Sequence, residues 1–263
     1  MLKKLLALKN DSTQKTLLVA IFLCLVCSII VSAAAVGLKP IQEKNKTADI
    51  KKNILDVAGL LQENTDIDAE FKNIEPRIVD IETGNFSDDV DVQVYNQRKA
   101  AKDPVLSQSL TADEDIAKIK RRANYATVYF VKEQEQTRLI ILPVHGYGLW
   151  STMYGFIALE PDANTIFSLK FYEHGETPGL GGEIDNPTWR DIWQGKKIFN
   201  DTNEFKLEVV RGKTDPSSAD LPYQIDGLAG ATLTSKGVSN LMQYWLGING
   251  FGPFLNKLQK ENS

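Results

Sequence analysis

The spacing of apolar residues divides the chain into a helical part and a later part with strand-like alternation. Apolar residues recur at helical spacing between residues 41 and 80, which predicts helix there. A further helix is predicted from Thr111 to about Arg122, because Glu114 follows Thr111 in the pattern of a capping box. Residues 82–110 are polar and mixed, with one short alternating stretch over 90–94.

Beyond residue 126 the period of the pattern changes from that of a helix to that of a strand. Alternation predicts strands over 127–131, 138–144, 153–159, 166–171 and 205–210. Helical spacing returns over 187–194, over 234–246, and in a short segment at the end. Helices followed by a mainly antiparallel sheet with flanking helices predict an α+β domain.

One run of 22 residues, 17–38, contains no charged side chain. Its length matches the ~20 residues that a helix needs to cross the hydrocarbon core of a membrane. A cleaved signal peptide is the alternative, because the run ends in small residues, but the apolar region of a signal peptide is usually shorter. Four lysines against one aspartate precede the run, which favours a cytoplasmic N-terminus, and lysines also follow it.

These patterns predict four parts of the chain. We expect a cytoplasmic segment over 1–16, a transmembrane helix over 17–38, a helical lead-in over 39–125 and an α+β domain over 126–263. The net charge is −4, and since residues 1–38 carry +3, residues 39–263 carry −7. An acidic exported part does not favour nucleic-acid binding.

Composition also limits the chemistry of the chain. With 43 % hydrophobic and 24 % charged residues, the chain is too apolar to be disordered. It has only two histidines, and both cysteines lie inside the apolar run, so we expect no metal cluster of Cys and His ligands. No nucleophile and base have the spacing of a hydrolase.

The first candidate site is the segment DGLAGATLTS at 226–235, which leads directly into an apolar-periodic helix. Free backbone N–H groups and the positive end of the helix dipole make such a start a natural phosphate site. The alternative is an ordinary helix N-terminus, capped by the side chain of Thr234 or Ser235.

The second candidate site is the segment HGETPGLGGE at 174–183, which directly follows a predicted strand. It has four glycines in eight residues, which indicates a backbone that a ligand approaches closely. An ordinary tight turn is the alternative, and we expect His174 to be satisfied by backbone groups. Neither G-x-G-x-x-G nor a P-loop occurs, so we do not expect this chain to bind NADH itself.

Together with GYGLWSTMYG at 146–155, the two segments resemble the FMN-binding domain found in the family of the C subunit of the Na⁺-translocating NADH:quinone reductase. The G subunit of the Rnf electron-transport complex, a paralogue, is the nearest alternative. The resemblance covers the whole chain and implies an FMN joined through its phosphate to a threonine. The flavin-transfer motif Asp-x-x-Ser/Thr-Gly-Ala-Thr matches Asp226, Gly230, Ala231 and Thr232, and departs only at Ala229. Thr232 is therefore the expected attachment site, with Thr234 as the alternative.

The resemblance also implies which other residues surround the cofactor. We expect Trp150 and Leu180 to contact the isoalloxazine, although Trp150 is also compatible with a core position and Asp226 with a turn. No catalytic residue and no metal ligand are expected, because the cofactor performs the redox chemistry. The expected cofactor-binding residues are Trp150, Glu176, Thr177, Gly179, Leu180, Gly181, Asp226, Gly230, Ala231 and Thr234.

As a member of such a complex, the chain is expected to pass electrons that come from NADH toward a second flavin-carrying membrane subunit and quinone. Expected partners are that subunit, an NADH-oxidising subunit, a flavin transferase during maturation and the lipid bilayer. The expected location is the bacterial inner membrane, with a single span and a periplasmic soluble domain. Because 17–38 has no charged residue, the Na⁺ path is expected in the partners. Alternatives from other classes are a flavin-free binding or sensor domain and a membrane-anchored hydrolase.

Overall fold

The computed structural model describes residues 12–134 and 136–261, and its chain divides into the units Met1–Ile50 and Lys51–Ser263. Most of the expected segment 1–16 lies outside the described residues. Helix α2, Thr13–Val57, contains the whole uncharged run and ends inside the second unit. By length and composition it is the one helix among the described residues that is able to cross a membrane, and none of its most apolar window is buried.

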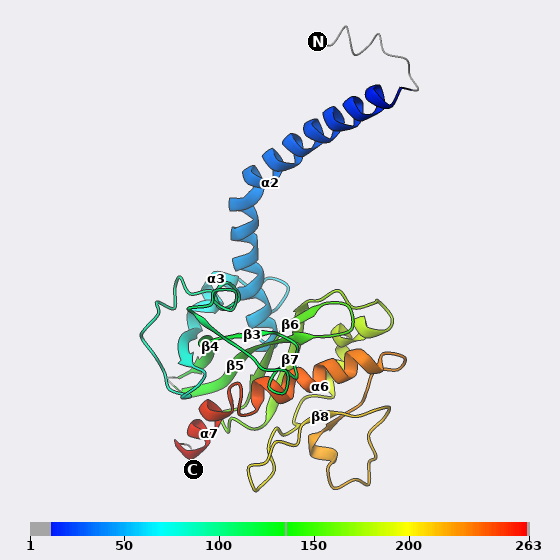
Figure 1. Cartoon of the computed structure of the whole chain (residues 1–263). Coiled ribbons are helices and arrows are strands. Elements are labelled where there is room, and N and C mark those ends of the chain that lie inside the picture. Colours follow the sequence, from blue (N-terminus) through cyan, green and yellow to red (C-terminus); the bar gives the residue numbers. More distant parts are fainter. Residues whose placement is uncertain (1–11, 135, 262–263) are drawn as a thin grey trace. The chain divides into compact units, whose positions relative to one another are not determined.

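The second unit is built on a five-stranded antiparallel sheet (Figure 1). The strand order is β1-β4-β5-β6-β7, so that the last four strands form a meander. The bounds are β1 Ile74–Asp80, β4 Tyr125–Glu133, β5 Gln136–Tyr147, β6 Thr152–Leu159 and β7 Ile166–Glu173. Four of the predicted strands are thus confirmed as β4–β7, and the α+β class is confirmed with them.

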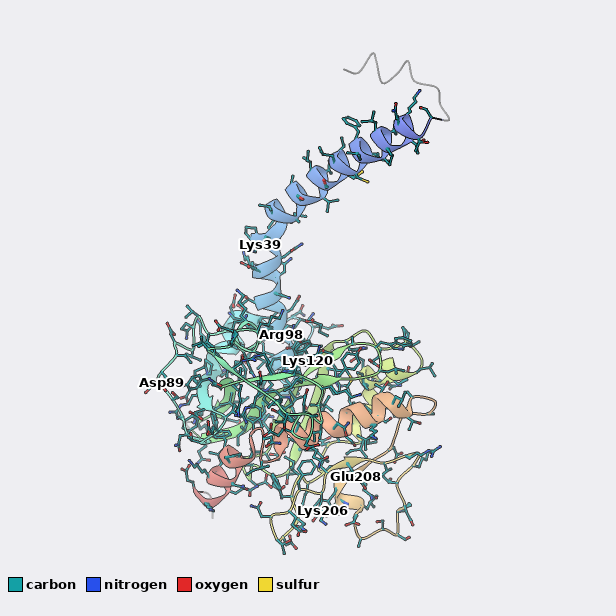
Figure 2. The ribbon with its side chains drawn as sticks, viewed as in Figure 1. Lys39, Asp89, Arg98, Lys120, Lys206 and Glu208 are labelled. Atoms are coloured by element: carbon teal, nitrogen blue, oxygen red, sulfur yellow. The ribbon has the colours of Figure 1, made fainter. Side chains whose placement is uncertain are left out.

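Shorter elements surround the sheet. The predicted strand over 205–210 is reduced to β8, which pairs with β9 in parallel over only two residues of each strand. Charged side chains such as Asp89, Lys206 and Glu208 lie on the outside (Figure 2). The other bounds are α3 Ile67–Glu70, α4 Gln97–Ala100, β2 Ser107–Ser109, β3 Arg121–Ala123, α5 Pro187–Asp191, β8 Glu208–Val209, β9 Gln224–Ile225, α6 Thr232–Leu246 and α7 Gly252–Glu261, with 3₁₀ turns at Phe71–Asn73, Gly181–Asp185 and Leu221–Tyr223.

The helix predicted over 41–80 is wrong beyond α2 and the short α3, because residues 74–80 form strand β1. Ile74 and Ile78 are four residues apart, which places them on one face of a helix but also on one face of a strand. Pairing with β4 decides between the two. Pro76 is compatible with β1 because this strand lies at the edge of the sheet.

The helix predicted over 111–122 is also wrong, although the local signal is real. The backbone N–H and the hydroxyl of Thr111 both donate to the Glu114 carboxylate, as in a capping box. The chain then turns, because the Asp115 carboxylate accepts from the backbone N–H groups of residues 119 and 120. Lys118 and Lys120 have positive φ, which no α-helix tolerates, and the segment continues into β3.

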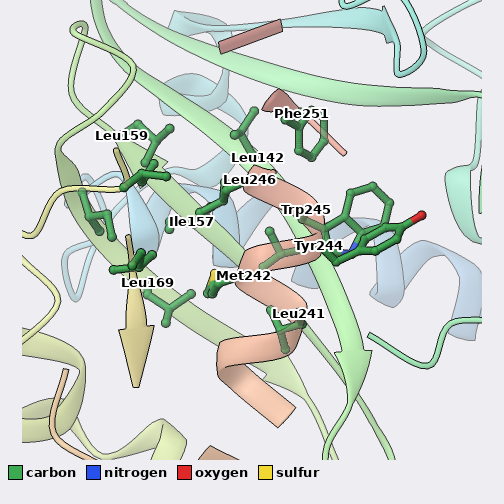
Figure 3. Packing of buried hydrophobic residues seen from close by; sticks show 14 of the residues in the cluster. Leu142, Ile157, Leu159, Leu169, Leu241, Met242, Tyr244, Trp245, Leu246 and Phe251 are labelled. Atoms are coloured by element: carbon green, nitrogen blue, oxygen red, sulfur yellow. The ribbon is translucent and has the colours of Figure 1, made fainter. Parts of the chain in front are cut away.

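Helix α6 forms the main layer on the sheet and holds the core together. Its apolar side chains at helical spacing face the strands, as Figure 3 shows for Leu241, Met242 and Trp245, which share one cluster with Leu142 and Ile157. The Trp245 Nε1–H donates to the His145 carbonyl in β5 at 2.6 Å, which fixes the helix along that strand. The start of α6 is thereby positioned beside the loops that leave β5 and β7.

Candidate functional site

Three loops meet at the start of helix α6, and one buried carboxylate joins them. The Oε1 of Glu176 accepts from the backbone N–H groups of Leu149 and Trp150, both at 3.0 Å, and of Ser151 at 3.4 Å. Its Oε2 accepts from the Thr234 hydroxyl at 2.6 Å. Glu176 is only 5 % exposed. The segment after β7 is therefore bonded both to the β5–β6 loop and to α6.

The electrostatics of Glu176 follow from these bonds. Burial disfavours a carboxylate, but hydrogen bonds from Thr234 and the 149–151 backbone outweigh it and hold the pKa of Glu176 below its ordinary value. No ion pair to this carboxylate is found in the described part of the chain. The charge is stabilised by converging N–H and O–H groups, an arrangement known as an anion nest.

Thr232 is the first residue of α6 and is exposed. The preceding Ala231 is the N-cap residue, with no side-chain hydrogen bond to the helix. Capping by Thr234 or Ser235, as predicted for an ordinary helix start, is therefore wrong. Thr234 is only 1 % exposed and its hydroxyl is bonded to Glu176, while the Ser235 hydroxyl accepts from the Leu228 N–H. The N–H groups at the start of α6 remain available to a ligand.

A hollow of about 210 Å³ lies beside Thr232. Two cationic residues on its wall, Arg211 and Lys236, are both exposed. Within the described residues, neither side chain has an ion pair. Two free cations and a helix N-terminus together favour a bound anion at this place.

Three apolar side chains in the segments that meet at the start of α6 are exposed. Trp150 is 64 % exposed and Leu180 is 45 % exposed, so a core position for Trp150 is wrong. Leu180 packs on Gly230: a Cβ added to this glycine would lie 3.1 Å from the Leu180 Cδ2. Leu233, next to Thr232, is exposed as well. The side chains of Trp150, Leu180 and Leu233 thus offer apolar contact near the start of α6.

The glycines of the 174–183 segment serve different purposes. Gly179 has φ +74°, with nothing within 4 Å of an added Cβ. A Cβ on Gly181 would lie 2.5 Å from the Thr234 hydroxyl oxygen, so Gly181 is needed for packing within the protein. The carbonyl of exposed Thr177 closes the turn by accepting from the N–H groups of Leu180 and Gly182.

Two further candidate residues have partners of their own. The Asp226 Oδ1 accepts from the backbone N–H and the hydroxyl of Thr214, and these bonds lower the pKa of Asp226. His174 accepts from the Glu176 N–H through Nδ1, and its Nε2 lies 2.7 Å from Asp185. Within residues 12–134 and 136–261, no group of three or more His, Cys, Asp and Glu side chains is placed to hold a metal.

The structure adds residues that sequence reasoning missed. Arg211 and Lys236 belong to no motif: Arg211 is brought to Thr232 by the fold, whereas Lys236 lies one turn further along α6. Gly148 lies within the segment GYGLWSTMYG, but only the structure shows why a glycine is needed at this position. A Cβ at this position would lie 2.5 Å from the Glu176 Oε1.

Comparison with known proteins agrees with this geometry. Residues 148–247 match the family model of the FMN-binding domain, and this range contains all three loops. The C subunit of the Na⁺-translocating NADH-quinone reductase of Pseudomonas aeruginosa is 50 % identical over 255 residues, covering 95 % of this chain and 98 % of the relative. Its counterpart in Vibrio alginolyticus is also 50 % identical over 255 residues, covering 97 % of this chain and 98 % of its own.

Solved structures show the same fold. The crystal structure of Shewanella oneidensis NqrC has a TM-score of 0.74 and 35 % identity, covering 82 % of this chain and 99 % of that one. The structure of the corresponding reductase subunit from Parabacteroides distasonis has a TM-score of 0.64 and 29 % identity, covering 83 % and 96 %. The resemblance found in the sequence is thereby confirmed, and it favours the quinone reductase over Rnf. The chain belongs to the NqrC family, which forms the C subunit of the Na⁺-translocating NADH-quinone reductase, an oxidoreductase complex.

Proposed function

We propose that this chain is the FMN-carrying electron-transfer subunit of its complex, with FMN joined by a phosphoester to the Thr232 hydroxyl. The observation that carries the proposal is the start of α6. An exposed threonine begins a helix whose N-cap residue has no side-chain hydrogen bond to it, within the range that matches the FMN-binding family.

The surrounding residues fit the parts of FMN. Once joined to Thr232, the phosphate is a diester with one negative charge, and the N–H groups of α6 with Arg211 and Lys236 offer positive potential to it. The isoalloxazine is a flat apolar ring system, and the exposed side chains of Trp150 and Leu180 offer apolar contact. FMN supplies the transfer of electrons, whereas the protein binds and orients it and excludes water from one side of the ring.

Thr232 fits the acceptor role better than Thr234. The Thr234 hydroxyl is buried and bonded to Glu176, so a phosphate on it would break that bond inside the protein. In the transfer step, the Thr232 oxygen forms a bond to the phosphorus of a pyrophosphate-activated flavin. The bond from this phosphorus to its leaving phosphate breaks, and the hydroxyl proton is released. A flavin transferase is the partner that this step requires, and Asp226 is a candidate for its recognition.

In the assembled complex, electrons from the NADH-oxidising subunit reach this flavin through partner redox centres. They leave toward a second flavin-carrying membrane subunit and then toward ubiquinone. Residues 17–38 contain no charged side chain, so we assign Na⁺ movement to the partners.

The domain boundaries proposed from the sequence complete this assignment. Residues 17–38 of α2 anchor the chain in the bacterial inner membrane, with residues 1–16 in the cytoplasm. The lead-in 39–125, which contributes edge strand β1 to the sheet, and the FMN-binding domain 126–263 lie together in the periplasm. Support comes from the lysines that precede the span and from the acidic composition of the part that follows it.

Intact-mass measurement tests the attachment. The full chain, expressed with the flavin transferase, is expected to gain the mass of one FMN less one water and to fluoresce on a denaturing gel. Thr232→Ala is expected to abolish both signals while the far-UV circular dichroism is retained, because the Thr232 side chain is exposed.

Thr234→Ser serves as the matched control, because a serine hydroxyl keeps the bond to Glu176, and it is expected to remain fully labelled. Fluorescence that persists in Thr232→Ala and disappears in a Thr234→Val variant would move the attachment to Thr234. A wild-type chain without bound flavin would favour the flavin-free binding domain.

A further inference from the structure

We infer that Glu176 is a positioning residue of the flavin site. It faces the protein and sets the places of Trp150 and Leu180 by bonding their loops to the start of α6. The inference rests on the proposed attachment of FMN at Thr232. It also corrects the expectation that the Glu176 side chain contacts the cofactor, because its carboxylate is turned inward and almost fully buried.

Glu176 holds the β5–β6 loop through backbone N–H groups of that loop. The backbone N–H groups of Leu149 and Trp150 donate to the Glu176 carboxylate and, within the described chain, to no carbonyl. The loop also closes on itself, because Gly148 N–H donates to the Ser151 carbonyl and the Tyr147 hydroxyl donates to the Trp150 carbonyl. Glu176, 26 residues from Trp150 in sequence, adds the bonds that satisfy the Leu149 and Trp150 N–H groups. Gly148 permits the approach, because a Cβ there would meet this carboxylate.

Glu176 also holds the loop that carries Leu180. Residues 175–182 close on themselves through the Thr177 carbonyl, and Gly175 N–H donates to the Ser151 hydroxyl at 2.6 Å. Glu176 adds the bond to Thr234, the third residue of α6. This bond holds the loop against the helix start, where Leu180 packs on Gly230.

The negative charge of Glu176 is stabilised by neutral donors only, as far as the described residues show. The carboxylate therefore stays stable only while the three backbone N–H groups and the Thr234 hydroxyl all point toward it. A neutral amide with its oxygen toward the 149–151 N–H groups would place its NH₂ group where Leu149 N–H and the Thr234 hydroxyl now donate. The Thr234 hydroxyl can turn to accept from this NH₂ group, but Leu149 N–H would face a donor. Glu176→Gln therefore changes the hydrogen bonding while it leaves the side-chain volume almost unchanged.

The test compares Glu176→Gln with Glu183→Gln in the full chain in detergent, each with flavin attached and each also with Thr232→Ala. Glu183 lies in the same segment, and its carboxylate accepts from the Asn186 amide rather than from the β5–β6 loop, so it controls for the lost charge. Hydrogen exchange of the Leu149 and Trp150 amides is read without flavin. We expect it to be roughly tenfold or more faster in Glu176→Gln and unchanged in Glu183→Gln.

The second measurement follows the exposure and the surroundings of the flavin in the flavin-loaded chains. Glu176→Gln is expected to raise acrylamide quenching of flavin fluorescence by about twofold or more and to weaken the visible circular dichroism of the flavin. Thr234→Val, which removes one donor and keeps the volume, is expected to do the same to a smaller extent, and Thr234→Ser is expected to restore the wild-type signal. This second pair keeps the test decisive if Glu176→Gln does not fold.

Unchanged exchange at Leu149 and Trp150 would overturn the inference. So would a lower melting temperature together with unchanged quenching and dichroism, because Glu176 would then be a structural residue only. Failure of the proposed function gives a different result, namely a wild-type chain without FMN on Thr232. In that case the exchange measurement still tests the bonds of Glu176.

Discussion

The side chain of Leu180 packs on Gly230, so closely that a Cβ on this glycine would lie 3.1 Å from the Leu180 Cδ2. The glycine-rich loop and the helix-start segment thus touch at one point, and Thr232 is two residues further along the chain. Gly230 itself has φ +72°, a conformation in which glycine is favoured. Leu180 therefore occupies the place next to the proposed attachment site.

The first prediction concerns Leu180→Ala. Because the side chain is half-exposed, the free energy of unfolding is expected to fall by only about 0.5–1 kcal/mol. The visible absorption of the attached flavin is expected to shift, because an apolar neighbour of the ring is lost. Absorption spectra and urea denaturation measure the two effects. Val105→Ala, at a side chain 83 % exposed, is the control and is expected to change neither; an unchanged spectrum in Leu180→Ala would remove Leu180 from the flavin site.

The second prediction separates the two glycines of the loop. Gly179→Ala is expected to cost about 1–2 kcal/mol because of its positive φ, and Gly179→Asn is expected to recover much of this, since asparagine tolerates that conformation. Gly181→Ala is expected to cost about 1–3 kcal/mol, because its Cβ would collide with the Glu176–Thr234 bond. Gly181→Asn is expected to be no better. Recovery by asparagine at both positions, in thermal unfolding, would contradict the packing role of Gly181.

The third prediction concerns pH. The His145 ring is stacked on Tyr154 with centroids 5.3 Å apart and lies 4.8 Å from the Trp245 ring, and burial lowers the pKa of His145 to about 3. In the unfolded chain the pKa is ordinary, so below about pH 6.5 the unfolded state binds a proton that the folded state does not. Stability is therefore full above that pH and is lost as the pH falls toward 3.

Between pH 7 and 5 the pKa shift of His145 is expected to lower the free energy of unfolding by about 2 kcal/mol. In His145→Phe, which keeps an aromatic ring between Tyr154 and Trp245, the free energy of unfolding is expected to fall less over the same range. Urea denaturation at several pH values measures the difference. Identical slopes for the two proteins would show that His145 is protonated in the folded state.

The fourth prediction concerns the anchor. Deleting residues 1–38 is expected to give a soluble acidic domain, because the remaining residues carry a charge of −7. Deleting residues 1–58 is expected to prevent folding, since it removes the buried side chains of Ile54, Leu55 and Val57, each contributing about 1.5–3 kcal/mol. It also removes Asp56, which pairs with Lys170 in β7. Sedimentation with membranes in about 1 M salt, which screens charge interactions, tests solubility; a 39–263 fragment that remains membrane-bound would indicate a second binding surface.

The sequence was sufficient for the elements whose pattern is decided locally. Strands β4 and β7 alternate well enough to be found, β5 and β6 contain short continuous apolar runs, and α6 has its apolar residues at helical spacing over four turns. Strand β1 was missed because Ile74 and Ile78 satisfy both periods, and only the partner strand β4 resolves them. At Thr111 the capping bonds form, but Asp115 captures the next N–H groups before a helix can begin.

The candidate site was predicted as a set of motifs but not as an arrangement. Glycines and threonines at 174–183 and 226–235 mark where a ligand is expected, whereas the inward direction of Glu176 depends on N–H groups from a third segment. Arg211 and Lys236 carry no local signal, because a lone cation in a loop or on a helix is common. Arg211 becomes visible as a neighbour of Thr232 only in the folded chain, whereas Lys236 already lies one helical turn beyond Thr232 in the sequence.

The position of α6 in the chain has a consequence for the timing of maturation. Its apolar face packs on strands that precede it, and its first turn is bonded to Glu176, 58 residues earlier. Contacts between residues so distant in sequence form late and slowly, because the loop between them must close first. A nascent chain would therefore present Thr232 in a disordered segment for some time before the helix start exists. If the transferase recognises the folded helix start, flavin is attached only to chains that have folded, and chains that misfold earlier carry no flavin.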